Sequence, residues 1–284
     1  MDQYIQTNRF ITIETSLGKD KLLPTMFSGV EHISDLFHFK ITALSTDHAI
    51  KPDSLIGKEV TITINARTKK YFHGYIDRFT VGESAAHSMR EYRMTMVPWL
   101  AFLGRTENRR IFQNKTTSEI LKIVFDDLNF KDYEFKIQGP QSTREYCVQY
   151  GESDLHFISR LLEEEGFSYY FKQANKKHTL VIVDQNSSFE KCCSQGITYS
   201  RGTTPDNEIN SWEHEYEFHK GTWTLNDYNF KEPNKSQLAE SLTQSKFTNI
   251  KSYKHYDYPA IHDLGRSRDI AKIRMEGEEV LMNA

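Results

Sequence analysis

The sequence has few cysteines, few prolines and no long apolar run. Its 284 residues include 3 cysteines and 7 prolines. An odd cysteine count, with Cys192 and Cys193 adjacent, is no disulfide framework, and the scattered prolines leave no proline-rich linker. Because no run of about 18 apolar residues occurs, we expect no membrane span. The first residues lack the basic and apolar regions of a signal peptide, so we expect a chain that is made in the cytosol and stays there at first.

An excess of positive charge is also lacking. The chain carries 36 basic and 39 acidic side chains, a net charge of −3, which argues against a general nucleic-acid surface. With 38% hydrophobic and 26% charged residues, the composition is that of a soluble globular protein. The length allows two domains, or one large core with an insertion.

The 11 histidines do not form a metal-ligating pattern. His214 and His219 are five residues apart in a predicted strand, so their side chains point to opposite faces. The Cys192-Cys193 pair lacks the two-residue gap with which two thiolates reach one zinc ion. Neither common type of glycine-rich phosphate loop is present. We therefore predict no metal and no cofactor.

The acidic run at 163–165 raises the question of acid–base catalysis. Adjacent helical positions diverge by about 100°, so no two of the three carboxylates can converge on one atom, and we expect a solvated face. Ser153, Asp154 and His156 have the side chains of a triad, but a triad is assembled across a fold and no G-x-S-x-G elbow is present. Helix capping explains Ser153 and Asp154. We therefore predict no catalytic residue and no enzymatic activity.

The first hundred residues are rich in short β-branched or aromatic runs. We predict strands at 10–13, 37–44, 60–64, 71–76 and 92–97, with a turn at Gly82 to Ser84. Pro98 ends the last of them, because proline cannot donate to a ladder. Strands of this number and spacing indicate an antiparallel barrel or sandwich.

Residues 150–171, YGESDLHFISRLLEEEGFSYYF, predict a capped helix, a glycine stop and an aromatic strand. Ser153 is the expected N-cap, and Asp154 places negative charge at the positive end of the helix. Gly166 supplies the left-handed residue that ends the helix. Helical spacing predicts an apolar stripe of Leu155, Ile158, Leu161 and Leu162, and alternation predicts a strand face of Phe167, Tyr169 and Phe171.

The segments around this module complete a compact α/β unit over 105–184. Thr116 and Glu119 form a capping box ahead of a predicted helix. Strands are expected at 133–137 and 146–150, and a hairpin joins 167–171 to 180–183. Beyond it, a polar, turn-rich stretch at 185–208 precedes strands at 209–218 and 222–230 and a last helix at 270–280.

A basic cluster of Arg105, Arg109, Arg110 and Lys115 comes just before the capping box. The cluster is either a surface for a partner or phosphate group, or a set of ion pairs with neighbours such as Glu107 and Glu119. We favour the ion pairs.

In this order, the segments resemble the VgrG family, the spike proteins of bacterial type VI secretion, and the related hub of contractile phage baseplates. The resemblance runs from about residue 15 to about 278, and the module at 150–171 is its most specific part. The positions that carry the family motifs, and to which the resemblance assigns structural roles, are Gly57, Gly74, Pro98, Trp99, Arg110, Gln113, Asn114, Glu152, Asp154, Leu155, Arg160, Leu161, Glu164, Gly166, Asp227, Pro233 and Pro259.

The resemblance implies a mainly β fold with an inserted α/β domain, built on tube-type antiparallel β-barrels. Residues 1–104 with 185–208 are expected to form the first, discontinuous barrel, 105–184 the inserted domain, and 209–284 the start of a second, incomplete barrel. Relatives continue into an OB-type barrel and a trimeric β-helix needle. Because the chain stops at Ala284, we expect only the base of the spike, as a fragment or a natural truncation.

The function implied is that of a structural hub that adapts a sixfold secreted tube to a threefold puncturing tip. Implied partners are two further copies in a homotrimer, an Hcp-like tube protein and, through the needle, a PAAR-type tip protein and effectors. The protein would assemble in the cytoplasm and leave with the injection machine. A phage tail hub, or the hub of an extracellular contractile injection particle, is the alternative. A cell-wall hydrolase is a further one, but the convergent carboxylates it requires are not found.

Overall fold

The computed structural model describes residues 4–85, 88–191, 198–199, 208–209, 211–258 and 264–279. The chain forms two compact units, residues 1–189 and 190–284. Cys192, Cys193, Pro259 and Val280 lie outside the described residues. None of the described helices is both long and apolar enough to cross a membrane.

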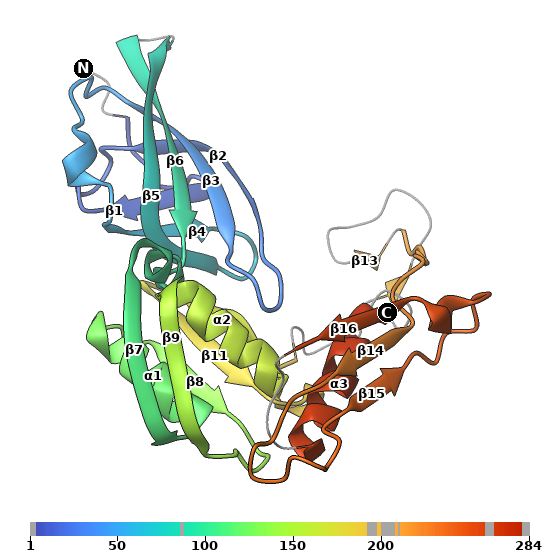
Figure 1. Ribbon diagram of the computed structural model, residues 1–284. Helices are drawn as coiled ribbons and strands as arrows, with labels where there is room; N and C mark the ends of the chain where they lie inside the picture. The colour runs from blue at the N-terminus through green and yellow to red at the C-terminus, as the bar shows by residue number, and fades with distance from the viewer. Residues whose placement is uncertain are drawn as a thin grey trace. The chain divides into compact units, whose positions relative to one another are not determined.

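The first unit begins with a curled, six-stranded antiparallel sheet (Figure 1). In the order β1-β4-β5-β6-β3-β2, its strands are β1 (Ile11–Thr15), β4 (Glu59–Ile64), β5 (Lys70–Ala85), β6 (Met89–Val97), β3 (His38–Ser45) and β2 (Leu23–Val30). A short 3₁₀ turn, Pro52–Ser54, precedes β4. Alternating residues of these strands fill one core, in which Phe37, Ile62 and Tyr92 are fully buried. The five predicted strands are confirmed, and β2 is one more.

The turn predicted at Gly82 to Ser84 is wrong, because β5 runs through it. This strand has 16 residues and pairs with β6 from Tyr75 to Ala85, with register irregularities at Ile76/Arg78 and Val81/Ser84. A Cβ on Gly82 would lie 3.0 Å from the Glu91 carbonyl oxygen. Glycine here therefore permits a close strand approach at a bulge rather than a reversal of the chain.

The second part of the first unit is the α/β insertion, which follows a 3₁₀ helix at Trp99–Arg105. Its antiparallel ribbon joins β7 (Glu107–Lys115) to β9 (Arg144–Ser153), and its three-stranded sheet has the order β10-β11-β8. The bounds are β8 (Tyr133–Lys136), β10 (Ser168–Ala174) and β11 (Lys177–Val183), with α1 (Thr117–Asp127) and α2 (Asp154–Glu165). A 3₁₀ turn at Asn186–Ser188 follows β11.

The predicted helix signals of the insertion are confirmed. Thr116 and Glu119 form the capping box of α1, and Ser153 caps α2 by accepting from the backbone N–H of His156 (3.1 Å). Gly166 ends α2 with a φ of 69°. Both helices bury an apolar face in one core, whose fully buried members include Leu121, Val124, Phe157, Leu161 and Ile182.

The second unit contains a small mixed sheet with a helix. β14 (Thr222–Leu225) lies between antiparallel β15 (Ala239–Leu242) and parallel β16 (Lys254–Asp257). α3 (Leu264–Glu278) packs Ile270, Ala271 and Met275 against Trp223 and Leu225. The remaining elements are β12 (Thr198–Tyr199), β13 (Glu208–Ile209) and a 3₁₀ turn at Ile250–Ser252.

Two strand predictions in this unit are wrong in extent. The strand expected at 222–230 ends at Leu225, and residues 211–220 belong to no strand. Their aromatic alternation has the period of a strand, but alternation alone does not supply the neighbouring backbone that a ladder requires. The second barrel expected over 209–284 stays a prediction.

Candidate functional site in the first unit

A buried carboxylate at the start of α2 organises the polar interior of the insertion. The side chain of Asp154 is 2% exposed and lies 2.6 Å from the guanidinium of Arg110. It also accepts hydrogen bonds from Thr106 (2.7 Å), Gln149 (2.7 Å) and Asn108 (3.1 Å). The donors come from the end of the 3₁₀ helix, from β7 and from β9, so Asp154 fixes three elements against α2.

The electrostatics of Asp154 follow from these contacts. Burial acts to raise the pKa of its carboxyl, but the hydrogen bonds and the Arg110 charge outweigh burial and hold the pKa below its usual range. A carboxylate with this many donors is a structural anion, not a proton donor. Capping, the role predicted for Asp154, therefore describes only part of what it does.

A chain of ion pairs continues along α2, and it corrects the prediction of a solvated acidic face. Arg144 on β9 lies 2.6 Å from Glu164 and 2.7 Å from Glu165. Arg160 lies 3.1 Å from Glu164 and 2.7 Å from Glu152. Adjacent helical carboxylates do diverge, but a guanidinium presents several N–H groups over a wide fork. Two neighbours therefore reach the same cation, and the Glu165 side chain is only 6% exposed.

One carboxylate in this chain of ion pairs, Glu152, has a lowered pKa. Burial acts to raise the pKa of Glu152, and its bonds from Arg160 and His156 (2.7 Å) lower it overall. Among the described residues, no group of three or more His, Cys, Asp or Glu side chains could hold a metal ion. The arrangement joins elements of the insertion. The structural roles that the resemblance assigns to Arg110, Glu152, Asp154, Arg160 and Glu164 stay a prediction.

Two arginines of the basic cluster before α1 form ion pairs, the alternative favoured from the sequence, but the partners differ. Arg105 pairs with Asp77 of β5 (3.1 Å), and Arg110 pairs with Asp127 as well as Asp154. Glu119 instead accepts from the Thr116 backbone within the capping box. The expected pairing to Glu107 and Glu119 is therefore wrong for these arginines.

Three positions of the motif set require glycine, for two different steric reasons. Gly57 and Gly166 adopt φ values of 73° and 69°, in the left-handed region that glycine enters without strain. A Cβ on Gly74 would lie 2.6 Å from Met96 Cγ and 2.7 Å from the Val97 carbonyl oxygen. Only glycine fits there unless β6 shifts.

The other motif residues divide between core and surface. Trp99, which follows Pro98 at the end of β6, is 2% exposed and stacks on Phe130 at 4.7 Å. Leu161 is fully buried and Leu155 is half-buried. Three motif residues are exposed: Gln113 and Asn114 (φ 51°) on β7, and Pro233 in the second unit. Asp227, also in the second unit, is 8% exposed.

Two histidines that sequence reasoning did not select join the insertion to the sheet. His73 on β5 and His178 on β11 are 4% and 1% exposed, and their Nδ1 atoms lie 2.9 Å apart. The backbone N–H of Trp99 donates to His178 Nε2 (3.1 Å). His178 therefore carries its proton on Nδ1 and donates it to His73 Nδ1, which leaves the His73 proton on Nε2.

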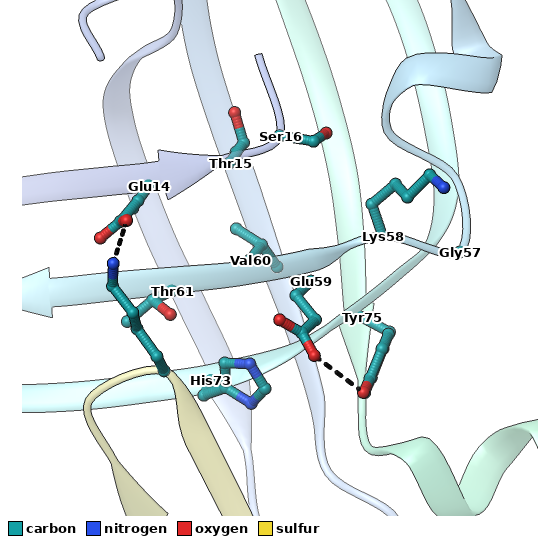
Figure 2. Close-up of a pocket in the computed structure, with 11 residues that line it drawn as sticks. Glu14, Thr15, Ser16, Gly57, Lys58, Glu59, Val60, Thr61, His73 and Tyr75 are labelled. Atoms are coloured by element: carbon teal, nitrogen blue, oxygen red, sulfur yellow. Dashed lines mark hydrogen bonds and ion pairs between the residues drawn. The ribbon is translucent and has the colours of Figure 1, made fainter. Parts of the chain in front are cut away.

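A cavity of about 510 Å³ opens beside this pair (Figure 2). Lys176 pairs with Glu14 (2.5 Å) on one side of it, and Tyr75 donates to Glu59 (3.2 Å) on the other. Burial, followed by the charge and hydrogen bond of Glu59, raises the pKa of Tyr75 to about 12. The cavity walls are polar, but each carboxylate has a partner within the wall.

Aromatic rings and backbone bonds complete the junction between the sheet and the insertion. Phe37 packs edge-on against Phe171 (5.1 Å) and His178 (5.5 Å). The backbone of Ser34 donates to the Tyr169 carbonyl oxygen (2.7 Å). No local sequence pattern could have revealed these contacts, because their partners are more than 100 residues apart.

Comparisons with known proteins identify relatives of the whole chain. The profile of the phage tail baseplate hub (GPD) family matches residues 30–284. The type VI secretion system spike protein VgrG1c of Pseudomonas aeruginosa PAO1 is 32% identical over 262 residues, which cover 90% of this chain and 36% of VgrG1c. The chain thus spans about a third of the length of that relative.

Solved structures resemble the fold. The Escherichia coli c3393 protein, a component of the type VI secretion system with structural similarity to the T4 bacteriophage tail proteins gp27 and gp5, matches with a TM-score of 0.60 and 28% identity over 66% of this chain and 52% of its own. A tail protein from Neisseria meningitidis MC58 matches over 95% of this chain and 76% of its own, with a TM-score of 0.66 and 12% identity.

Proposed function

Because the chain belongs to the phage tail baseplate hub (GPD) family, we propose that it is the hub-like base of a type VI secretion spike. The observation that carries this proposal is 32% identity to a type VI secretion spike protein over 90% of the chain. A curled antiparallel sheet with an α/β insertion, as found here, supports it.

The proposed role is mechanical and not catalytic. Three copies form a ring that matches a sixfold Hcp-like tube on one side and a threefold tip on the other. The ring works by surface complementarity, as closed homo-oligomers do. It assembles in the cytoplasm and is expelled with the tube. The proposal includes a PAAR-type tip protein and effectors as partners, which would bind through a C-terminal needle.

A phage tail hub is the second candidate, and the description of the matching family, phage tail baseplate hub, favours it. The Neisseria tail protein has a similar fold. That match covers almost the whole chain but at 12% identity, so it supports the fold alone. The secretion protein from Escherichia coli is 28% identical. The difference in identity favours the secretion hub over the phage hub or the hub of an extracellular particle.

The test is assembly with a tube protein. We expect the purified chain, mixed with hexameric Hcp-like tube protein, to form threefold rings that stack on the tube in negative-stain images and co-sediment with it. A chain that stays monomeric and does not bind the tube protein contradicts the proposal. Sustained turnover in a muramidase assay would instead favour a cell-wall hydrolase.

A further inference from the structure

Residues 211–220 of the second unit have the sequence SWEHEYEFHK, in which positions 212–218 alternate strictly between two kinds of side chain. Even positions hold the rings of Trp212, His214, Tyr216 and Phe218, and the positions between them hold Glu213, Glu215 and Glu217. In an extended chain, successive side chains point to opposite faces, and every second residue is about 7 Å further along. The segment therefore has one aromatic face and one face with three carboxylates in a row.

No strand pairs with this segment in the described part of the chain. Trp212, Tyr216 and Phe218 are 62%, 64% and 52% exposed. The rings contact one another along the segment: Trp212 donates to His214 Nε2 (3.1 Å), and His214 stacks on Tyr216. A strand-like segment with open backbone edges and exposed rings is a template for the addition of another strand.

The segment is held at its C-terminal end. Lys220 pairs with Glu278 of α3 (2.7 Å), and the Phe218 ring packs edge-on against Tyr253 (5.0 Å). Gly221 donates to the Tyr253 carbonyl oxygen (2.9 Å) and accepts from the Thr243 N–H (3.0 Å). The chain thus enters β14 with a backbone neighbour on each side, whereas no ladder joins residues 211–218 to any other described residue. They extend the middle strand of the sheet beyond its neighbours.

We propose that residues 211–218 bind an extended, basic β-strand by edge pairing. Lysine or arginine side chains of the partner lie opposite Glu213, Glu215 and Glu217, and its apolar side chains cover the aromatic face. Opposite charges across a ladder stabilise a pair, and like charges weaken it.

The same charges exclude a second copy of the segment as the partner. Pairing two copies places carboxylates opposite carboxylates in one register, and opposite aromatic rings in the other. The inference does not rest on the hub assignment, because it uses only this segment and its surroundings.

The probe is a short synthetic peptide of alternating lysine and valine, labelled for fluorescence anisotropy. We expect it to bind the full chain, and the triple variant Glu213→Lys, Glu215→Lys, Glu217→Lys to weaken binding about tenfold or more. The triple variant should instead bind the matching glutamate–valine peptide. An N-methylated lysine peptide keeps its charges but lacks backbone donors, and should not bind.

The matched control is Glu83→Lys, Glu134→Lys, Glu145→Lys, which makes the same change in net charge at exposed positions of the first unit. It should retain most of the binding. Equal losses in the two triple variants, or no binding of the lysine peptide at about millimolar concentration, would overturn the proposal. Self-association of the chain that disappears in the Glu213/Glu215/Glu217 variant would also contradict it.

Discussion

The Nδ1 atoms of His73 and His178 lie 2.9 Å apart and share one proton between two neutral rings. His178 cannot give up this arrangement, because its Nε2 is already the acceptor for the Trp99 backbone N–H. A further proton on His73 Nδ1 would place two N–H groups face to face, and one on His178 Nε2 would face the Trp99 N–H. The junction between the sheet and the insertion therefore requires both imidazoles to be neutral.

The first prediction is that acid destabilises the first unit at pH values well above those at which carboxylates titrate. Burial, followed by the charge of His73, lowers the pKa of His178 to about 3, against about 6.5 in an unfolded chain. A depressed folded pKa stabilises the fold above the unfolded pKa, and this stability is lost as the pH falls toward 3. We expect a loss of about 2 kcal/mol in the free energy of unfolding between pH 7 and pH 5.

Urea unfolding across this pH range measures the effect. His178→Gln should flatten the dependence on pH, whereas His32→Gln, a change at an exposed histidine, should leave it as it is. A free energy of unfolding that is constant from pH 7 to pH 5 would show that the pair is not neutral and buried in solution.

The second prediction separates the anchor of α2 from its cap. Asp154→Ala removes the buried carboxylate that Arg110 and three neutral donors share, and should lower the free energy of unfolding by about 3–5 kcal/mol. Ser153→Ala removes one capping bond and should cost about 1 kcal/mol. Denaturant titration compares the two variants. Similar losses would mean that Asp154 acts only as a helix-end charge.

The third prediction concerns the guanidinium that joins two adjacent carboxylates. Arg144→Met removes the cation that the partly buried Glu164 and Glu165 share and leaves Arg160 as the remaining ion-pair partner of Glu164, and we expect a loss of about 3 kcal/mol. Arg144→Lys presents one point charge in place of a fork, so it should recover only part of that loss.

A surface ion pair serves as the control for Arg144. Arg93 and Glu91 are 3.6 Å apart with side chains 60% and 41% exposed, so Arg93→Met should cost about 0.5 kcal/mol or less. Chemical denaturation of the three variants measures and compares their free energies of unfolding. Complete rescue by lysine would count against the requirement for a fork.

The fourth prediction uses two glycines with different surroundings. Gly74→Ala pushes a methyl group into the backbone of β6, which cannot rotate away, and should cost about 1–3 kcal/mol. Gly104→Ala meets only Leu155 Cδ2 at 3.4 Å, so its effect should be within about 0.5 kcal/mol. Thermal unfolding of the pair tests the steric argument. A neutral Gly74→Ala would imply that β5 and β6 are further apart than described.

The helix ends of the insertion were predictable because each capping or stop signal lies within a few residues of the chain. The capping box of Thr116 and Glu119, the Ser153 cap and the Gly166 stop depend on neighbours within one helical turn. The prediction that the acidic run forms a solvated face was wrong for the opposite reason. Its partner, Arg144, lies on β9, and neither helix geometry nor spacing within α2 indicates which cation a strand brings to it.

Strand extent depended on partners in the same way. The ends of β5 are set by β6, so a turn-like Gly82 remained inside a strand. Residues 211–218 have an ideal strand pattern, yet form no ladder with the described residues. The histidine junction was not predictable at all, because nothing near His73 or His178 in sequence marks either as buried.

The interlocked junction means that the insertion is not a modular part. Phe37, His73 and Trp99 are 0%, 4% and 2% exposed, and rings or backbone from both sides cover them. Excising residues 99–184 and rejoining the chain would expose aromatic side chains of the sheet to solvent. The excised piece would lose the surface of the sheet on which its β10–β11 hairpin packs. The two parts can therefore be exchanged between relatives only together, with the surfaces between them matched.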